Sequence, residues 1–239
     1  MAKITTTITP GIDSVIAARI DAMTKAEWAR KTGVEKLPFV TISREYGTEG
    51  PLVAKTMVEV LNEQHPSRFP WMAFDKEILS RISEESGHHP GMVQLIADEK
   101  LSILGQVVID LLSQLPDSYE IYRKMAKAIC ILAEKGHAIL IGRGSAVLTR
   151  QIDRGLHIRL VAPRDYRIER VMKLYDRDRG DAEKEVRKMD AEREQFVKRF
   201  TMASASDPYL YHFIFNTAMC TTEEIVRTAI EFLRMRKWL

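Results

Sequence analysis

The residues best placed to do chemistry lie between positions 38 and 56, where a β-branched stretch runs into a turn bracketed by Gly47 and Gly50. This pattern predicts a strand, a loop and then a helix. A glycine turn at the start of a helix directs several backbone N–H groups to one place, and the helix dipole adds positive potential there. The segment therefore predicts a loop that binds an anion such as phosphate.

This loop lacks two parts of a complete P-loop. A P-loop reads Gly-x-x-x-x-Gly-Lys-Ser/Thr, in which the lysine reaches the phosphates and the hydroxyl reaches Mg²⁺. In the form of the loop where Gly-Lys is followed by Gly-Thr, matching Gly47 to the internal glycine puts Gly50 and Leu52 where the lysine and the hydroxyl would fall. The positive charge that would neutralise the phosphate must then come from other side chains.

The elements that position this loop follow an alternating pattern. Short apolar runs at 137–141, 156–161 and 212–216 predict further strands, and amphipathic stretches between them predict helices. Strands that alternate with helices indicate an α/β fold with a mainly parallel sheet. Ligands of such folds bind at the carboxyl ends of the strands, where the Gly47 turn and a second turn, Gly142-Arg143-Gly144, would both lie.

Composition limits the class of protein. The 239 residues are 45% hydrophobic, and 36 basic against 33 acidic residues give a net charge of +3, so we expect a globular protein without a dedicated nucleic-acid surface. Cys130 and Cys220 have no metal-type spacing and are expected to be reduced and structural. No apolar run approaches the roughly 18 residues of a membrane span, so the expected location is cytoplasmic.

Three further segments leave alternatives open. An N-terminal extension, 1–37, should form a helix after Pro10 that covers apolar surface, or else serves as a dimerisation arm for a homodimer. His88-His89 could suggest a metal site, but adjacent side chains do not share a face, so a loop is the preferred interpretation and no metal ligand is assigned. Asp75 precedes an apolar periodic run, which favours a helix cap over a contact with substrate.

The segment 176–199 is densely charged. Charges at this spacing are typical of a solvated helix with ion pairs between positions i and i+4. A few of its arginines could still project over a phosphate site, because the guanidinium fork matches phosphate oxygens.

Four stretches in order resemble the cytidylate kinase-like family, a divergent branch of the P-loop nucleotide kinases. They are Thr-Ile-Ser-Arg-Glu-Tyr-Gly-Thr-Glu-Gly (41–50), Ile-Gly-Arg-Gly-Ser-Ala (141–146), His-Ile-Arg-Leu-Val-Ala-Pro-x-x-x-Arg-Ile-Glu-Arg (157–170) and Asp-Pro-Tyr-Leu-Tyr-His-Phe-Ile-Phe-Asn-Thr (207–217). The resemblance covers roughly residues 38–238. It implies a three-layer α/β domain over 38–239 with a five-stranded, mainly parallel sheet, a helical acceptor region at about 75–136 and an arginine-rich lid at about 176–206.

The resemblance also implies ATP and Mg²⁺ as cofactors and a small nucleotide as partner. Carried over by position, the phosphate loop would contain Ser43, Arg44, Gly47, Thr48, Glu49 and Gly50. The acceptor would contact Asp75, Arg143, Arg167 and Arg170. The catalytic residues would be Arg143, Asp190 and Arg193, with Arg199 as a further lid residue.

Two functions from different classes fit this sequence. One is ATP-dependent phosphoryl transfer to a nucleoside monophosphate such as CMP or to another small acceptor, which the arginines favour. The other is a non-catalytic nucleotide-binding or regulatory module, which the missing lysine, hydroxyl and carboxylate (Ile141 replaces the acidic residue) favour. Arg44, Lys55 or Arg143 could replace the missing charge, and Glu45 or Glu49 could approach magnesium.

Overall fold

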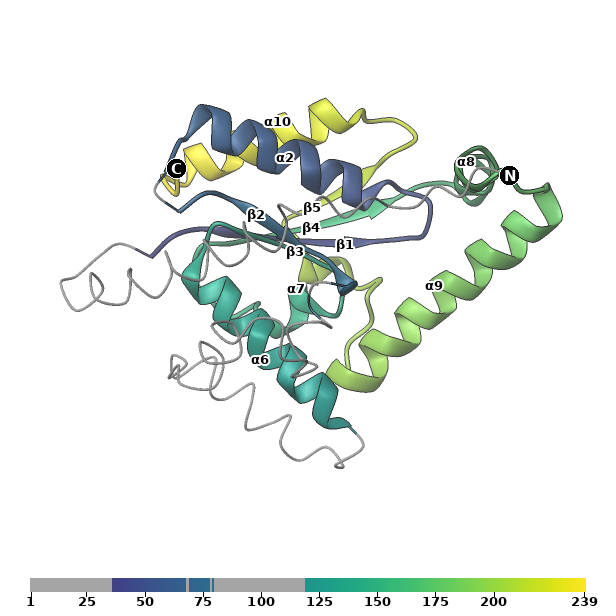
Figure 1. The fold of residues 1–239 in the computed structure, drawn as a ribbon, viewed down its shortest axis with the longest axis horizontal. Helices are drawn as coiled ribbons and strands as arrows, with labels where there is room; N and C mark the ends of the chain where they lie inside the picture. Colours follow the sequence, from purple (N-terminus) through teal and green to yellow (C-terminus); the bar gives the residue numbers. More distant parts are fainter. Residues whose placement is uncertain (1–35, 68, 78, 80–118) are drawn as a thin grey trace, which may run out of the picture.

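The computed structural model describes residues 36–67, 69–77, 79 and 119–239 (Figure 1). The expected N-terminal helix and the His88-His89 loop lie outside the described residues. Most of the extension expected at 1–37 and of the acceptor region expected at 75–136 also lies outside them.

A five-stranded parallel sheet forms the centre of the fold, as expected. Its spatial order is β2-β3-β1-β4-β5, so the strand that carries the phosphate loop is central. The strands are β1 (Phe39–Arg44), β2 (Met72–Phe74), β3 (Ala138–Ile141), β4 (Gly155–Val161) and β5 (Phe213–Asn216). Residues Phe39 and Val40 of β1 are fully buried on opposite faces of the sheet, as the near-continuous apolar run predicts.

Helices cover both faces of the sheet, which makes three layers (Figure 1). Helices α2 (Gly50–Gln64) and α10 (Thr222–Met235) pack on one face, and α6 (Glu120–Lys135) and the short α7 (Ser145–Leu148) on the other. Local signals set several ends. Thr221 and Glu224 form a capping box at the start of α10, and Gly136 closes α6 at φ 73°, where a Cβ would lie 2.4 Å from Leu37 Cβ.

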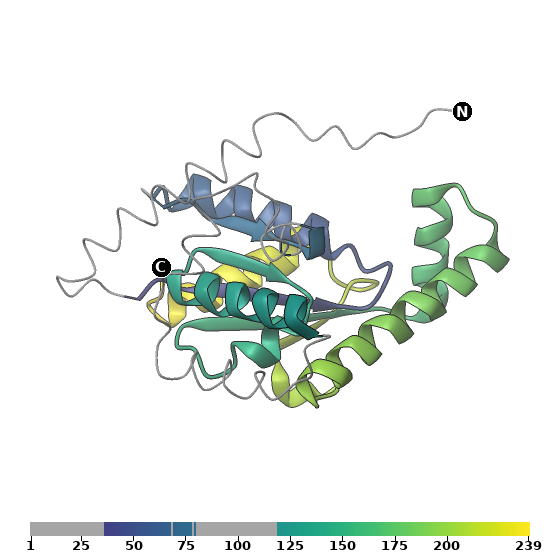
Figure 2. The same ribbon diagram turned by 60° about the horizontal axis from the view of Figure 1, so that its bottom comes forward.

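Two charged helices lie beyond the carboxyl edge of the sheet. Helix α8 (Arg164–Tyr175) follows β4, and the long α9 (Arg179–Thr201) returns from it toward the start of α6 (Figure 2). The rings of Tyr122 and Phe200 stack there with centroids 3.9 Å apart. A 3₁₀ turn, η2 (Pro208–Leu210), then leads into β5. Helix α9 corresponds to the predicted charged segment 176–199.

The second strand is shorter than expected. The aromatic stretch 69–74 predicts a strand, but β2 begins only at Met72. The backbone of Trp71 instead pairs with the side chain of Asn62, donating to Oδ1 at 2.7 Å and accepting from Nδ2 at 3.0 Å. Pro70 has no N–H to offer a sheet, so the ladder starts after it.

Neither cysteine is in a disulfide. Burial raises the pKa of the Cys130 thiol to about 12, so the thiol stays protonated and unreactive, in agreement with the structural role expected for it. Among the helices that the structure describes, none is both long and apolar enough to cross a membrane.

The buried His157 of β4 contacts His212, which is exposed just before β5. Thr41 Oγ1 lies 2.8 Å from Nδ1 of His157, and the backbone N–H of His157 donates to Nδ1 of His212 at 3.1 Å. Burial and the neighbouring His212 lower the pKa of His157 to about 4, and burial and Arg236 lower the pKa of His212. The folded protein therefore holds His157 neutral at pH values where an unfolded chain protonates it.

We expect this histidine to destabilise the protein in acid. Its pKa is depressed by folding, so its contribution is complete above the ordinary value of 6.5 and is lost as the pH falls toward 4. The loss should approach about 3 kcal/mol for a shift of this size. Urea unfolding between pH 4 and 7 measures it. The His157→Gln variant should lose this part of the pH dependence, and an unchanged slope would contradict the assignment.

Candidate functional site

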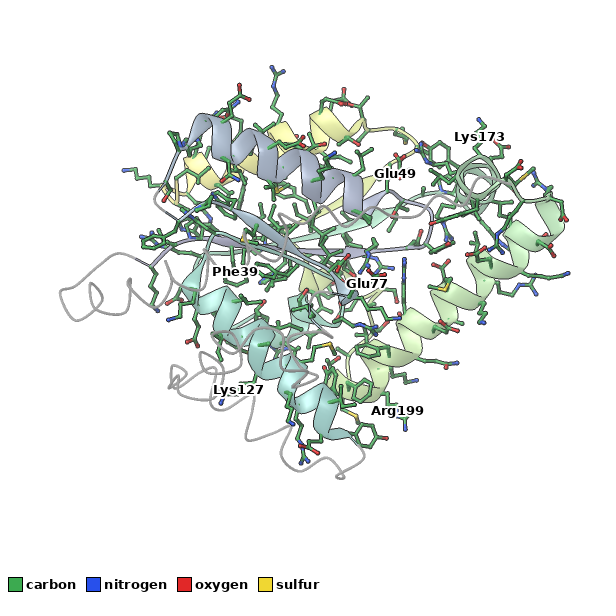
Figure 3. All side chains as sticks on the ribbon, in the orientation of Figure 1. Phe39, Glu49, Glu77, Lys127, Lys173 and Arg199 are labelled. Carbon is green, nitrogen blue, oxygen red and sulfur yellow. The ribbon has the colours of Figure 1, made fainter. Side chains whose placement is uncertain are left out.

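The two glycine turns meet at the carboxyl edge of the sheet, beside the start of α2. Gly47 and Glu49 adopt φ values of 85° and 54°, and Gly142 and Gly144 adopt 75° and 72°. Figure 3 shows Glu49 where the chain enters α2, on the side of α8. No described residue accepts a hydrogen bond from the backbone N–H groups of residues 47–50. Unpaired donors at a helix N-terminus are the arrangement that binds an anion.

A cavity of about 270 Å³ lies at the end of β1, where Ser43 and Arg44 line it. Arg44, Arg143 and Arg193 come to it from the end of β1, the turn after β3 and helix α9. The other lining residues are Ser43, Lys76, Ile141, Gly142, Gly144, Ser145, Ala146, Val147, Met189, Glu192, Phe196, Val197, Ala205 and Tyr211. Three arginines from distant parts of the chain thus converge on one hollow.

These three arginines are desolvated and repel one another. Burial, then Arg193 and Arg143, lower the pKa of Arg44 to about 9, while Asp75 acts in the opposite direction. Burial and Arg193 also lower the pKa of Arg143, and burial is the main cause that lowers the pKa of Arg193. A polyanion bound among them would offset both their desolvation and their mutual repulsion.

Their remaining contacts hold the guanidinium groups in place without neutralising them. The Nε atoms of Arg44 and Arg143 are buried without a hydrogen-bond partner. Arg143 lies over the ring of Phe196 at 4.5 Å, and Arg193 lies over Tyr46 at 5.2 Å while donating to the Arg44 carbonyl at 3.2 Å. Cation–π contacts and a carbonyl orient these groups and leave other N–H donors for a ligand.

A second group of arginines holds the loop from outside. Glu45 accepts from the Ala162 N–H at 3.1 Å and lies 3.3 Å from Nε of Arg167. Arg167 also donates to the Tyr46 carbonyl and to Asp190, and Asp190 accepts from the Tyr46 N–H at 2.8 Å. Arg167 and Asp190 therefore shape the loop, and neither lines the cavity.

A second hollow of about 320 Å³ lies on the other side of the loop. Thr48 and Glu49 line it from the loop, and the turn between β5 and α10 lines it opposite them. Arg170 of α8 also lines it and is paired with Glu49. Thr48 donates to the Glu45 carbonyl at 2.9 Å, which fixes the turn. The first hollow thus reaches the start of the loop at Arg44, and the second reaches Thr48 and Glu49.

Two other predicted residues have mainly local roles. Asp75 Oδ1 accepts from the Glu77 N–H at 3.0 Å, which confirms the capping interpretation. Its charge still acts on Arg44. Ser43 lines the cavity and accepts from Arg159 at 3.4 Å.

Magnesium held by the protein's own carboxylates does not fit this site. Glu45 and Glu49 are both paired with arginines, and Leu52 stands where a hydroxyl would be. The described part of the chain contains no group of three or more His, Cys, Asp or Glu side chains that could hold a metal ion.

Sequence reasoning missed Phe196, which supports Arg143, and Met189 in the same wall. Met189, Arg193 and Phe196 are spaced four and three residues apart, so they share one face of α9. That spacing was a readable signal, although the dense charges around it obscured it.

Comparison with known proteins agrees with this geometry. The model of the cytidylate kinase-like family matches residues 39–219. A search of curated proteins gives no significant match. The chain resembles the crystal structure of an uncharacterized protein from Eubacterium ventriosum, with 18% identity and a TM-score of 0.62 over 82% of this chain and 99% of that one.

Two weaker structural similarities accompany it. Shikimate kinase from Bacteroides thetaiotaomicron has 14% identity and a TM-score of 0.43, covering 84% of this chain and 99% of that one. TT1252 from Thermus thermophilus has 13% identity and a TM-score of 0.39, covering 84% and 98%. The family match spans most of the described sheet and both glycine turns, and the chain belongs to the cytidylate kinase-like family.

Proposed function

We propose that this kinase-like protein transfers a phosphoryl group from ATP to a nucleoside monophosphate such as CMP, or to another small phosphorylated acceptor. The observation that carries the proposal is the convergence of Arg44, Arg143 and Arg193 on a cavity at the start of a loop whose amides at positions 47–50 are unpaired among the described residues. Phosphoryl transfer asks a protein mainly to align two substrates and to neutralise spreading charge. The loop amides and the arginines can hold phosphate oxygens in position and neutralise their charge.

The two hollows suggest where each substrate binds. The Arg143 side, with Lys76 and Phe196, offers cations and a ring to an acceptor that carries a phosphate. The Glu49 side offers a polar wall to the donor, with its phosphates directed at the loop. An acceptor oxygen would attack the terminal phosphorus, and the bond to the bridging oxygen would break with its electron pair leaving on the diphosphate. In this proposal α8 and α9 act as the lid.

A second candidate is a nucleotide-binding module without turnover. The lysine and hydroxyl of a P-loop are absent, and both loop acids are already paired with arginines. Such a protein would use the same loop and hollows to bind nucleotide without transferring phosphate.

Binding and turnover together separate the two candidates. With the full chain, CMP and ATP should each raise the melting temperature, because a ligand that binds only the folded state stabilises it. Coupled ADP release in the presence of CMP and Mg²⁺ would support transfer. Stabilisation without ADP release across a panel of monophosphates would favour the binding module, and no stabilisation at millimolar nucleotide would contradict both.

Replacing Arg143 should weaken acceptor binding. Loss of a charge-assisted contact to phosphate costs roughly 10- to 100-fold in affinity, so Arg143→Ala should raise the Kd for CMP by that factor in calorimetry. Arg187→Ala is the matched control, because Arg187 is exposed on α9 and paired with Glu183. Equal CMP affinity in Arg143→Ala and in the parent chain would remove Arg143 from the acceptor site.

Replacing Glu49 should strengthen donor binding. Its carboxylate lies at the N-terminus of α2 and pairs with Arg170, where donor phosphates would otherwise bind. We expect Glu49→Gln to lower the Kd for ATP by roughly 3- to 10-fold, in line with the energy of a partly exposed ion pair. Arg170→Ala should act in the opposite direction. Weaker ATP binding in Glu49→Gln would mean that this carboxylate supports the donor site.

A further inference from the structure

The side chain of Arg44 passes between two glycines. It leaves the end of β1, runs beside Gly50 at the start of α2 and ends beside Gly142 after β3. A Cβ on Gly50 would lie 3.2 Å from both Cγ and Cδ of Arg44, and a Cβ on Gly142 would lie 1.9 Å from its terminal nitrogen. No residue with a side chain at position 142 is compatible with this placement.

Gly50 is also the position where a P-loop would carry its lysine. The aliphatic part of the Arg44 side chain thus lies beside the position where the lysine of a P-loop would begin. Gly142 has a positive φ of 75°, so the turn after β3 favours glycine for its backbone as well as for the approach of Arg44.

The guanidinium of Arg44 has no carboxylate partner among the described residues. Arg167 and Arg170, which hold the loop, are both in ion pairs, whereas Arg44 forms no ion pair and its Nε is buried and unsatisfied. Asp75 stabilises its charge only as a neighbour. A partly buried cation without a carboxylate partner still costs free energy, which an anionic ligand would offset.

We propose that Arg44 takes the place of the missing P-loop lysine: it contacts the phosphoryl group held by loop 44–50, and Gly50 and Gly142 create the passage for its side chain. This inference rests on the proposed phosphate-binding role of the loop and names a residue for it. A guanidinium can contact two oxygens of one phosphoryl group, whereas a lysine supplies a single point charge. Arg44 would therefore also orient that group.

Sulfate is a suitable probe of this assignment, because it keeps its charge across the pH range of interest and contains no nucleoside. In calorimetry with the full chain, Arg44→Met should weaken sulfate binding roughly tenfold or more while keeping the apolar stem, and Arg44→Lys should restore part of it. Sulfate affinity of the parent chain should fall above about pH 9, and Arg44→Met should lose that fall. Arg187→Ala should behave as the parent.

The glycine passage is tested by a double-mutant cycle. Gly50 does not have a positive φ, so Gly50→Ala tests the passage without straining the backbone. It should weaken sulfate binding in the parent chain and have little further effect when Arg44 is already alanine, because the added Cβ acts by displacing the Arg44 stem. Cooperative thermal unfolding identifies variants that fail to fold. If the losses of sulfate affinity in the two single variants add up in the double variant, the glycine does not act through Arg44. Sulfate affinity in Arg44→Met equal to that of the parent would contradict the role of Arg44.

These outcomes are distinct from failure of the proposed function. ATP and CMP turnover that is unchanged in Arg44→Met, with unchanged sulfate binding, would overturn this inference and leave phosphoryl transfer standing. Arg44-dependent sulfate binding without any nucleotide binding would support Arg44 as a phosphate contact and overturn the proposed function.

Discussion

Arg167 makes the contact on which the geometry of the site depends. It joins three segments: the phosphate loop through Glu45 and the Tyr46 carbonyl, the end of β4 through the Ala162 carbonyl, and α9 through Asp190. Only 7% of it is exposed, so these charges interact with little screening by water. The same arginine lies against Gly47, where a Cβ would be 3.0 Å from the Arg167 carbonyl. A larger residue in the loop would push it away from α8.

This arrangement divides the arginines of the site into two kinds. Those paired with carboxylates, such as Arg167 and Arg170, shape the loop and attach it to the charged helices. Those that converge on the cavity have cation–π contacts, carbonyls or no partner in place of carboxylates. The ion pairs account for the position of the loop, and the unneutralised cations give the neighbouring cavity a positive potential. One residue type thus serves two purposes, set by its partners.

The loop at 44–50 lacks the lysine of a P-loop, and backbone amides and arginines from other segments are present in its place. Backbone amides of residues 47–50 remain available, because the fold neither caps α2 with a side chain nor pairs these groups with the sheet. The positive charges belong to Arg44 at the end of β1, Arg143 in the turn after β3 and Arg193 of α9. Because these segments are independent, the position of α9 also decides whether Arg193 reaches the site. The α8–α9 pair is therefore part of the site's electrostatics.

The sequence by itself determined the elements and their order. The apolar runs, the glycine turns and the Asp75 cap act through neighbours a few residues away, so the sequence pattern could predict them, and the resemblance supplied the candidate arginines. The tertiary structure decided which arginines meet the cavity and which hold the loop. Arg44 and Arg193 are far apart in the chain, and their separation in space depends on how α9 packs. Partners brought together by packing leave no local spacing to read, so Arg167 and Asp190 acquired their positions, and Arg44 its passage between two glycines, only in the folded protein.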